Sequence, residues 1–238
     1  MKILVFDIYG KFAHFRKFYT NSSSLTYGIP PRTTITGIIA AIMGLERDSY
    51  YDEFNSDNLK IAVKKIGTTQ KIIQTLNYMR ATTMNELIIG KEHTQVPFEI
   101  LRGKDNVRFR IYLTHRDKSI FEEIERRVKK NLFIYPPYFG SASFGCNILY
   151  VDTLKFEELR SNNYIDIGTV IRTDQVEEIN LQNYRGKLIK ERMTVDFSHD
   201  RNIKEVSSYI YDDDGKSIEV KIKDEIIRLS NGEYILFM

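Results

Sequence analysis

The first 44 residues contain two apolar runs joined by a polar loop. The run from Met1 to Tyr9 is apolar at nearly every position, which predicts a buried central strand. A second, shorter apolar run follows Pro30 and Pro31 and stops at Gly44. Proline pre-sets the first turn of a helix and glycine favours its end, so we expect a short apolar helix between them.

The next part of the chain has weaker patterns. Residues 59–71 carry apolar side chains at alternating positions, which predicts a strand. Residues 71–80 continue in the same manner as a second strand or a bent extension of the first. Residues 81–94 are polar and poorly patterned, and we interpret them as an excursion from the main sheet.

A hairpin, a helix and a strand follow in the middle of the chain. Residues 95–101 and 107–113 both alternate, and the segment 102–106 between them has the composition of a hairpin turn. Ser119 is in position to cap an amphipathic helix. The residues 146–151 form another apolar run, which predicts a strand.

This order is strand, helix, strand, strand, helix, strand, which is the ferredoxin-like or RNA-recognition-motif arrangement in the α+β class. We expect residues 155–163 to be polar and briefly helical. Short β patterns with turns at 212–215 and 230–232 follow them. We therefore predict a ferredoxin-like domain over residues 1–155 with an inserted thumb-like element, and a small antiparallel β subdomain over residues 156–238.

Positive charge is unevenly distributed along the sequence. Residues 1–160 hold 24 Lys and Arg against 17 Asp and Glu, a net charge of +7, whereas residues 161–238 hold 11 against 15, a net charge of −4. Binding to nucleic acid requires cations that face the phosphates. We therefore expect an RNA footprint in the first two thirds of the chain and not in the tail. The surplus is too small for indiscriminate binding, so shape and stacking should contribute.

Cysteine use and hydropathy indicate a cytoplasmic protein. Cys146 is the only cysteine, so no intramolecular disulfide can form, and its apolar neighbours predict a packed thiol. Asp7 interrupts the N-terminal apolar run, so we expect no signal peptide. The other apolar runs are far shorter than a membrane span. We expect no membrane partner.

The polar loop after the first strand interleaves aromatic rings with cations. It holds Phe15, Arg16, Lys17, Phe18 and Tyr19 in succession. Bases stack on rings while phosphates pair with Lys and Arg, so this composition suits a single-stranded nucleic acid. Aromatic residues near a strand end also commonly pack in the core. Both interpretations are open for each ring.

Several catalytic signatures are missing from the sequence. It has no phosphate loop ending in Gly-Lys-Ser/Thr, no paired Cys or His spacing for zinc and no Gly-x-Ser-x-Gly elbow. The acidic run 212–214 is typical of a solvated turn rather than a metal site. We predict no metal site and no cofactor.

Three stretches together resemble the signature of one protein family. Their residues are Gly10, Phe15, Arg16, Tyr19, Tyr27, Pro30, Pro31, Arg32, Thr33, Gly37 and Gly44, then Gln95 to Leu101, then Tyr138, Phe139, Gly140, Phe144 and Gly145. The pattern is similar to the fifth CRISPR-associated protein family, in the RAMP superfamily, and is closest to its type I-B branch. It covers residues 1–150 better than the rest of the chain.

The resemblance implies a non-catalytic RNA-binding subunit. That family supplies the subunit that holds the 5′ handle of crRNA in type I Cascade complexes for antiviral defence. A subunit of this kind caps one end of the complex, contacts its backbone and large subunits and meets target DNA through the complex. The excursion at 81–95 would be the thumb-like element that similar proteins use against the neighbouring backbone subunit.

The resemblance also implies roles for five residues. Arg16, Lys17 and Arg32 would hold phosphates of the handle. Phe15 and Tyr19 would stack on its bases or shape it. These five are the candidate RNA-binding residues.

An alternative function is metal-independent cleavage of precursor crRNA. The type I-C branch of the same family cleaves its precursor with a Tyr, Lys and His set, which can act as general acid, general base and charge stabiliser. Here His115 ends the strand expected at 107–113, and Tyr50 and Tyr51 follow the first helix. Thr114 stands where that branch would have a lysine. We therefore expect a binding protein, with an endoribonuclease centred on His115 as the alternative.

Overall fold

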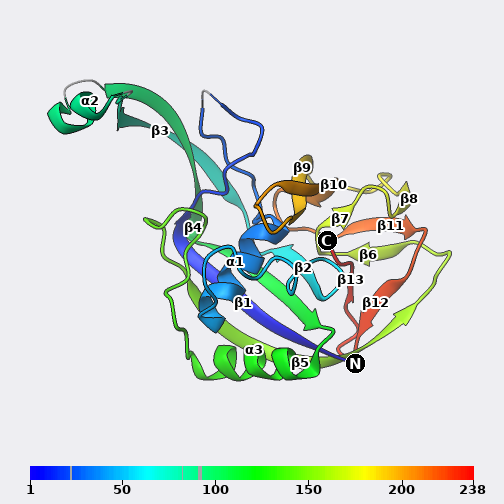
Figure 1. Cartoon of the computed structure of the whole chain (residues 1–238). Coiled ribbons are helices and arrows are strands. Elements are labelled where there is room, and N and C mark those ends of the chain that lie inside the picture. Colours follow the sequence, from blue (N-terminus) through cyan, green and yellow to red (C-terminus); the bar gives the residue numbers. More distant parts are fainter. Residues whose placement is uncertain (22, 82, 91–92) are drawn as a thin grey trace.

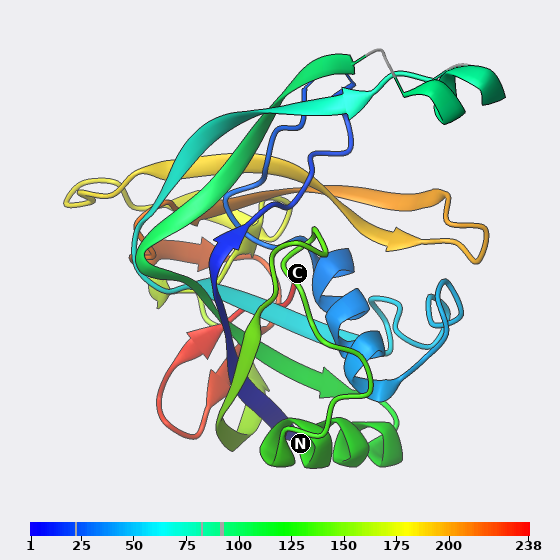
Figure 2. The same ribbon diagram turned by 90° about the vertical axis from the view of Figure 1, so that its left-hand side faces the viewer.

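Strands carry most of the regular structure in this chain (Figures 1 and 2). The computed structural model describes residues 1–21, 23–81, 83–90 and 93–238, and its fold is α+β with antiparallel sheets. The helices are α1 (Arg32–Met43), α2 (Met84–Ile89) and α3 (Lys118–Lys130). The strands are β1 (Lys2–Ala13), β2 (Leu59–Lys65), β3 (Thr69–Met79), β4 (His93–His115), β5 (Asn147–Leu159), β6 (Ile165–Ile167), β7 (Ile171–Arg172), β8 (Val176–Ile179), β9 (Leu188–Phe197), β10 (Ile203–Asp212), β11 (Ile218–Ile222), β12 (Ile226–Leu229) and β13 (Tyr234–Ile235).

The first strand lies inside the largest sheet. β1 pairs antiparallel with β5 on one side and with β4 on the other. The order across the sheet is β13–β12–β5–β1–β4–β2, and β3 also pairs with β4. Every residue from Ile3 to Ile8 is buried. The prediction of a buried central strand is confirmed, and the strand continues to Ala13 instead of ending at Tyr9.

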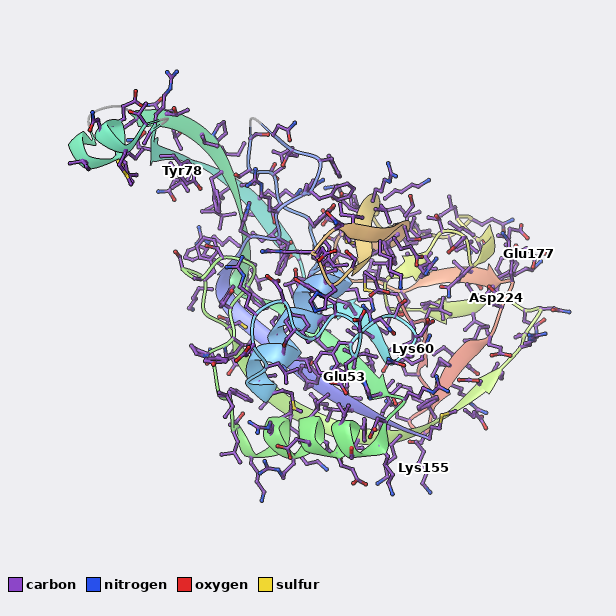
Figure 3. All side chains as sticks on the ribbon, in the orientation of Figure 1. Glu53, Lys60, Tyr78, Lys155, Glu177 and Asp224 are labelled. Atoms are coloured by element: carbon purple, nitrogen blue, oxygen red, sulfur yellow. The ribbon has the colours of Figure 1, made fainter. Side chains whose placement is uncertain are left out.

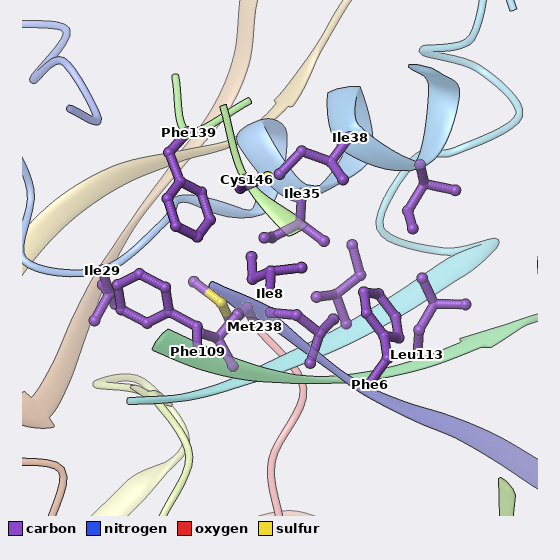
Figure 4. Packing of buried hydrophobic residues seen from close by; sticks show 14 of the residues in the cluster. Phe6, Ile8, Ile29, Ile35, Ile38, Phe109, Leu113, Phe139, Cys146 and Met238 are labelled. Atoms are coloured by element: carbon purple, nitrogen blue, oxygen red, sulfur yellow. The ribbon is translucent and has the colours of Figure 1, made fainter. Parts of the chain in front are cut away.

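Alternate residues of β1 face two different cores. Phe6 and Ile8 pack in the larger core with α1 and α3 (Figure 4). Ile3 and Val5 face a smaller core on the opposite side of the sheet. Side chains from residues 227–237 cover this smaller core. Successive side chains of a strand point to opposite faces, so one strand supplies both cores.

The end of α1 and the start of α3 have clear caps. Gly44 follows α1 with a φ of 77°, in the left-handed region that glycine favours, so the predicted end of this helix is confirmed. The cap of α3 is Asp117, whose carboxylate accepts hydrogen bonds from the backbone of Ser119 and Ile120. The expectation that Ser119 caps this helix is wrong, because its own hydroxyl donates to Asp117 at 2.7 Å.

The hairpin expected at 95–101 and 107–113 is one continuous strand. β4 pairs with β1 on both sides of the expected turn, with Gly10 opposite Val107 and Phe12 opposite Arg102. Residues 103–106 therefore form a bulge opposite a single residue of β1. The turn-like composition is real, but the two halves of β4 share β1 as a partner and do not pair with each other.

β3 and the outer half of β4 form an arm that projects from the body, with α2 at its tip (Figures 1 and 2). β3 pairs with β4 along its whole length. The excursion expected at 81–94 is the tip of this arm, except residues 82, 91 and 92, which lie outside the described residues. The sequence pattern missed α2, whose start is a capping box between Thr83 and Glu86.

The C-terminal part is built from short antiparallel strands, as predicted. They form two small sheets, β7–β10–β9 and β6–β11–β8. The turns expected at 212–215 and 230–232 are present, with positive φ at Gly215 and Gly232. The helix expected at 155–163 is wrong, because β5 runs to residue 159 and pairs there with β12.

Several contacts cross the expected boundary at residue 155. β5 spans it, β12 adds to the main sheet, and Met238 lies in the larger core (Figure 4). The division into residues 1–155 and 156–238 stays a prediction.

Cys146 is buried in the larger core. Burial raises the pKa of its thiol to about 12, which fits the packed thiol expected from the sequence.

Candidate nucleic-acid interface

The chain after β1 turns back on itself and forms a ribbon that rests on the base of the arm. The backbone N–H of Lys17 donates to the carbonyl of Leu25 at 2.9 Å, and that of Tyr27 donates to Phe15 at 2.8 Å. Ser24 is tied to β4, because its N–H donates to the carbonyl of Pro97 at 2.9 Å. These bonds tie the base of the ribbon to itself and to β4.

Phe15 is a core residue in this ribbon. Its side chain is 1% exposed, and its ring contacts the edges of Phe109 and Phe139 at centroid distances of 5.8 and 5.7 Å. A base cannot stack on a ring that is enclosed in this way. The role expected for Phe15 in stacking is therefore not supported by its position, and the packing interpretation accounts for it.

Arg32 is also buried, at the first position of α1. One guanidinium nitrogen donates to the Asp196 carboxylate at 2.6 Å, and the other donates to the carbonyls of Phe54 and Leu59 at 2.8 and 2.7 Å. The residue is 1% exposed. Its position argues against the phosphate contact expected for it, because the cation is enclosed and already paired with a carboxylate.

Lys17 joins the ribbon to β9. Its ammonium lies 2.8 Å from the Glu191 carboxylate and 5.5 Å from the centroid of the Tyr27 ring. Burial lowers the pKa of Lys17, but the Glu191 carboxylate outweighs this effect and the net pKa is raised. Lys17 therefore stays charged, while its charge is largely neutralised within the chain.

Arg16, Phe18 and Tyr19 are the members of this segment that face solvent. The Arg16 side chain is exposed and contacts the carbonyl of Thr20 at 3.3 Å. Phe18 and Tyr19 are 40% and 50% exposed, and their rings meet edge to face at a centroid distance of 5.2 Å. Two rings and a guanidinium thus share one surface. Phe18 was not among the candidates, although its place among alternating rings and cations was visible in the sequence.

The C-terminal part contacts the ribbon at Tyr27. The hydroxyl of Tyr27 donates to the carbonyl of Arg192 on β9 at 2.6 Å, and the Arg192 side chain is exposed. No sequence pattern predicts this contact, because residues 27 and 192 meet only through the tertiary fold.

His115 is enclosed at the end of β4. It is 9% exposed, its Nδ1 accepts a hydrogen bond from the backbone N–H of Asp117 at 3.0 Å, and its Nε2 lies 3.2 Å from the carbonyl of Glu53. The Phe54 ring contacts both His115 and Tyr50, at centroid distances of 5.9 and 6.2 Å. Both ring nitrogens of His115 are therefore engaged by backbone groups.

Tyr51 is engaged elsewhere, because its hydroxyl donates to the Asp48 carboxylate at 2.5 Å. Within the described part of the chain, no group of three or more His, Cys, Asp or Glu is arranged to hold a metal ion. Nor does any helix there have the length and apolar character needed to cross a bilayer.

Comparisons with known proteins point in one direction. A family model described as CRISPR-associated protein (Cas_Cas5) matches residues 3–201. A search of curated protein sequences finds no match. Among solved structures, the chain is similar to a CRISPR protein from Archaeoglobus fulgidus, at 15% identity and a TM-score of 0.59, with 98% of each chain covered.

A second similar structure belongs to a CRISPR RNA-guided surveillance complex, at 12% identity and a TM-score of 0.47, with 97% of this chain and 92% of that chain covered. Of the two, the likeness to the Archaeoglobus protein is the one that supports a shared fold.

Proposed function

Because this chain belongs to the Cas5 family of CRISPR-associated proteins, we propose that it is a crRNA-binding subunit of a type I-B Cascade complex. It grips the 5′ handle of crRNA and caps one end of the complex. The observation that carries the proposal is the surface of Arg16, Phe18 and Tyr19, where two rings and a cation face solvent on a ribbon whose base is hydrogen-bonded to β4. Single-stranded RNA is bound by this combination, because bases stack on rings and phosphates pair with cations.

The proposed interface differs from the five candidate residues. Arg16 and Tyr19 remain as direct contacts, and Phe18 joins them as a second exposed ring. Lys17 positions the ribbon through its ion pair with Glu191. Phe15 and Arg32 are buried and stabilise the fold that supports the ribbon.

The strand order supports a ferredoxin-like core under this interface. The four strands β5–β1–β4–β2 pair antiparallel, and α1 and α3 follow the first and third of them in the chain. This is the order that a βαββαβ unit adopts when it closes into one sheet.

We assign the arm to a neighbouring backbone subunit. Ile73, Met84 and Ile88 are 68%, 71% and 77% exposed, and Tyr78 also lies on the arm, at 47% exposed (Figure 3). Apolar side chains gathered on a projecting element mark a surface that a protein partner covers. In this proposal the large subunit and target DNA are reached through the assembled complex, in the cytoplasm.

The subunit is proposed to be non-catalytic. A general acid or base must reach the proton that it transfers, and both His115 nitrogens are engaged by backbone groups. Purified protein incubated with precursor RNA in chelator should leave the RNA intact, and His115→Ala should behave in the same way. Specific cleavage by the wild type that disappears in His115→Ala would show that the endoribonuclease alternative is the correct one.

RNA binding itself is tested by fluorescence anisotropy with a repeat-derived single-stranded RNA at several salt concentrations. Arg16→Gln should lower the slope of log affinity against log salt by about 0.7, the value for one phosphate contact. Tyr19→Ala should weaken binding, because a stacked ring contributes about 1–3 kcal/mol per base. Lys130→Gln removes another exposed cation, at the end of α3, and serves as the control.

The result that contradicts the proposed interface is a salt slope that Arg16→Gln and Lys130→Gln lower equally. Wild-type protein that fails to bind repeat-derived RNA at low salt would contradict the proposed function as a whole.

A further inference from the structure

A cavity of about 260 Å³ opens beside α1, on its solvent side. It is lined by Thr33, Thr34, Gly37, Ile38 and Ala41 of α1, by Tyr50, by Pro137, Tyr138 and Gly140, and by Arg201. Four separate parts of the chain therefore meet at this cavity. Two of them, around Thr33 to Gly37 and around Tyr138 to Gly140, are stretches that the sequence analysis singled out and that the proposed interface does not use.

We propose that this cavity holds one nucleotide of the bound RNA, with its phosphate on Arg201 and its base against Tyr138. The inference rests on the proposed RNA-binding function and gives that function a second contact site. It also assigns an RNA contact to residues 161–238, where the charge distribution led us to expect none.

The Arg201 side chain is exposed and weakly paired, so its guanidinium is available to a phosphate. It lies in the turn between β9 and β10, where its backbone N–H donates to the carbonyl of Ser198 at 2.8 Å. Its side chain is 55% exposed, and the Asp48 carboxylate is 3.9 Å away. That carboxylate already accepts from Tyr51 at 2.5 Å and lies 3.3 Å from Arg47. A guanidinium this weakly paired can turn to a phosphate, which accepts two of its N–H groups at once.

The two tyrosines supply a stacking surface and a hydrogen-bond donor. Tyr138 is 46% exposed, so one base can lie on its ring. Tyr50 is held in place by Tyr51 and Phe54, at ring-centroid distances of 4.9 and 6.2 Å. Burial and the nearby Asp48 raise the pKa of Tyr50, so its hydroxyl stays protonated and can donate to the ribose or phosphate.

The size and location of the cavity select a nucleotide of the same RNA. Its volume is just below the roughly 300 Å³ at which pockets for drug-sized ligands begin, so it has room for one nucleotide at most. A Cβ at Gly37 would lie 3.5 Å from the Tyr50 hydroxyl, in ordinary contact, so a longer side chain at this position would enter the cavity. The wall at 137–140 is bonded to the ribbon, since the N–H of His14 donates to the carbonyl of Phe139 at 3.1 Å. This bond places the cavity wall next to the ribbon that carries Arg16.

The test uses the full-length protein and the repeat-derived single-stranded RNA in the same anisotropy assay. Arg201→Gln should lower the salt slope by about 0.7. Tyr138→Ala should weaken binding by roughly 5- to 100-fold, and Tyr138→Phe should bind as the wild type does, because the ring is kept. Gly37→Leu should weaken binding by filling the cavity without changing charge. Thermal unfolding of each variant shows whether its fold is retained.

Arg228→Gln is the matched control for Arg201. Arg228 is 51% exposed with a carboxylate 3.4 Å away, and it lies on β12, outside the residues that line the cavity. If the wild type binds RNA while Arg201→Gln keeps its full salt slope, or lowers it no more than Arg228→Gln does, the cavity is not an RNA site and the proposed function stands without it. If the wild type binds no RNA, both the proposed function and this inference are overturned.

Discussion

Single residues in the segment from Phe15 to Tyr19 have very different environments, although the sequence presents them as one set. Phe15 is enclosed, Lys17 is paired with Glu191, and Arg16 and Tyr19 face solvent. The composition of the segment was informative about its chemistry. The direction in which each side chain points depends on the pairing of the ribbon, which composition does not contain.

Arg32 should be a stabilising residue. Arg32→Met is expected to lower the free energy of unfolding by about 3–5 kcal/mol, because it leaves the buried Asp196 carboxylate without its cation. Arg16→Met changes an exposed arginine and should stay within about 0.5 kcal/mol of the wild type. Urea denaturation measures both variants. Equal small losses would show that the Arg32 pair does not stabilise the fold.

His14 should make stability depend on pH. Its ring stacks on Phe98 at a centroid distance of 3.9 Å, and its Nδ1 lies 2.7 Å from the carbonyl of Glu99. Burial lowers the pKa of His14 below its ordinary value of 6.5, and the nearby Arg16 lowers it further, while Glu99 acts in the opposite direction. The unfolded chain therefore takes up the proton first as the pH falls.

The contribution of neutral His14 is complete above pH 6.5 and is lost as the pH falls below that value. His14→Phe keeps an aromatic ring on Phe98 but cannot titrate. Between pH 7.5 and pH 5, the free energy of unfolding of the wild type should therefore fall more steeply than that of His14→Phe. Chemical denaturation at a series of pH values measures this difference, and parallel curves would contradict it.

At the scale of elements, local signals located most segments, whereas pairing decided how they are joined. The end of α1 at Gly44 follows from local backbone geometry. The bulge at 103–106 has the composition of a hairpin turn, but β1 pairs with both halves of β4 and keeps them in one strand. The strand expected at 71–80 is present as β3, although most of its residues are exposed, whereas the start of β4 at His93 was not predicted.

The two glycines of the loop before β5 should respond differently to alanine. Gly140 has a φ of 78°, and an added Cβ would lie 2.0 Å from the carbonyl oxygen of His14. Gly140→Ala should therefore cost more than the roughly 1–2 kcal/mol of a left-handed residue alone. Gly145 has no atom within 4 Å of that position among the described residues, so Gly145→Ala should be neutral or slightly stabilising. Thermal unfolding compares them, and equal losses would contradict this account.

At the scale of the whole molecule, part of the positive charge in residues 1–160 forms ion pairs with acidic residues of the C-terminal part. Lys17, Arg32 and Lys65 pair with Glu191, Asp196 and Asp213, and the Lys65 to Asp213 distance is 2.8 Å. Burial lowers the pKa of Lys65, and Asp213 acts against this shift. Part of the positive surplus in residues 1–160 therefore binds the acidic tail of the same chain and is not available to RNA.

Residues 1–155 alone should fail to fold cooperatively. The fragment lacks β12 of the main sheet, Met238 of the larger core and the carboxylates that pair with its buried cations. Unpaired buried charges are strongly destabilising. Near-ultraviolet circular dichroism of the fragment should show no thermal transition, and co-expression with residues 156–238 should restore one. A cooperative transition in the isolated fragment would support the division at residue 155.

The sequence by itself determined the class of fold, the central strand, the end of the first helix and the family resemblance. These depend on local periodicity, on backbone preferences of proline and glycine, and on motif residues that can be compared one by one. The cores that cover both faces of β1 follow from its nearly continuous apolar run.

Only the tertiary structure decided which cations are free and which rings are exposed. A sequence does not show whether a lysine or arginine faces solvent or pairs with a carboxylate far along the chain. Lys17, which pairs with Glu191, is an example. The cavity beside α1 has the same origin, because Thr33, Tyr138 and Arg201 become neighbours only when the sheets pack. Burial and pairing are properties of contacts between distant segments, and local patterns do not encode which segments will meet.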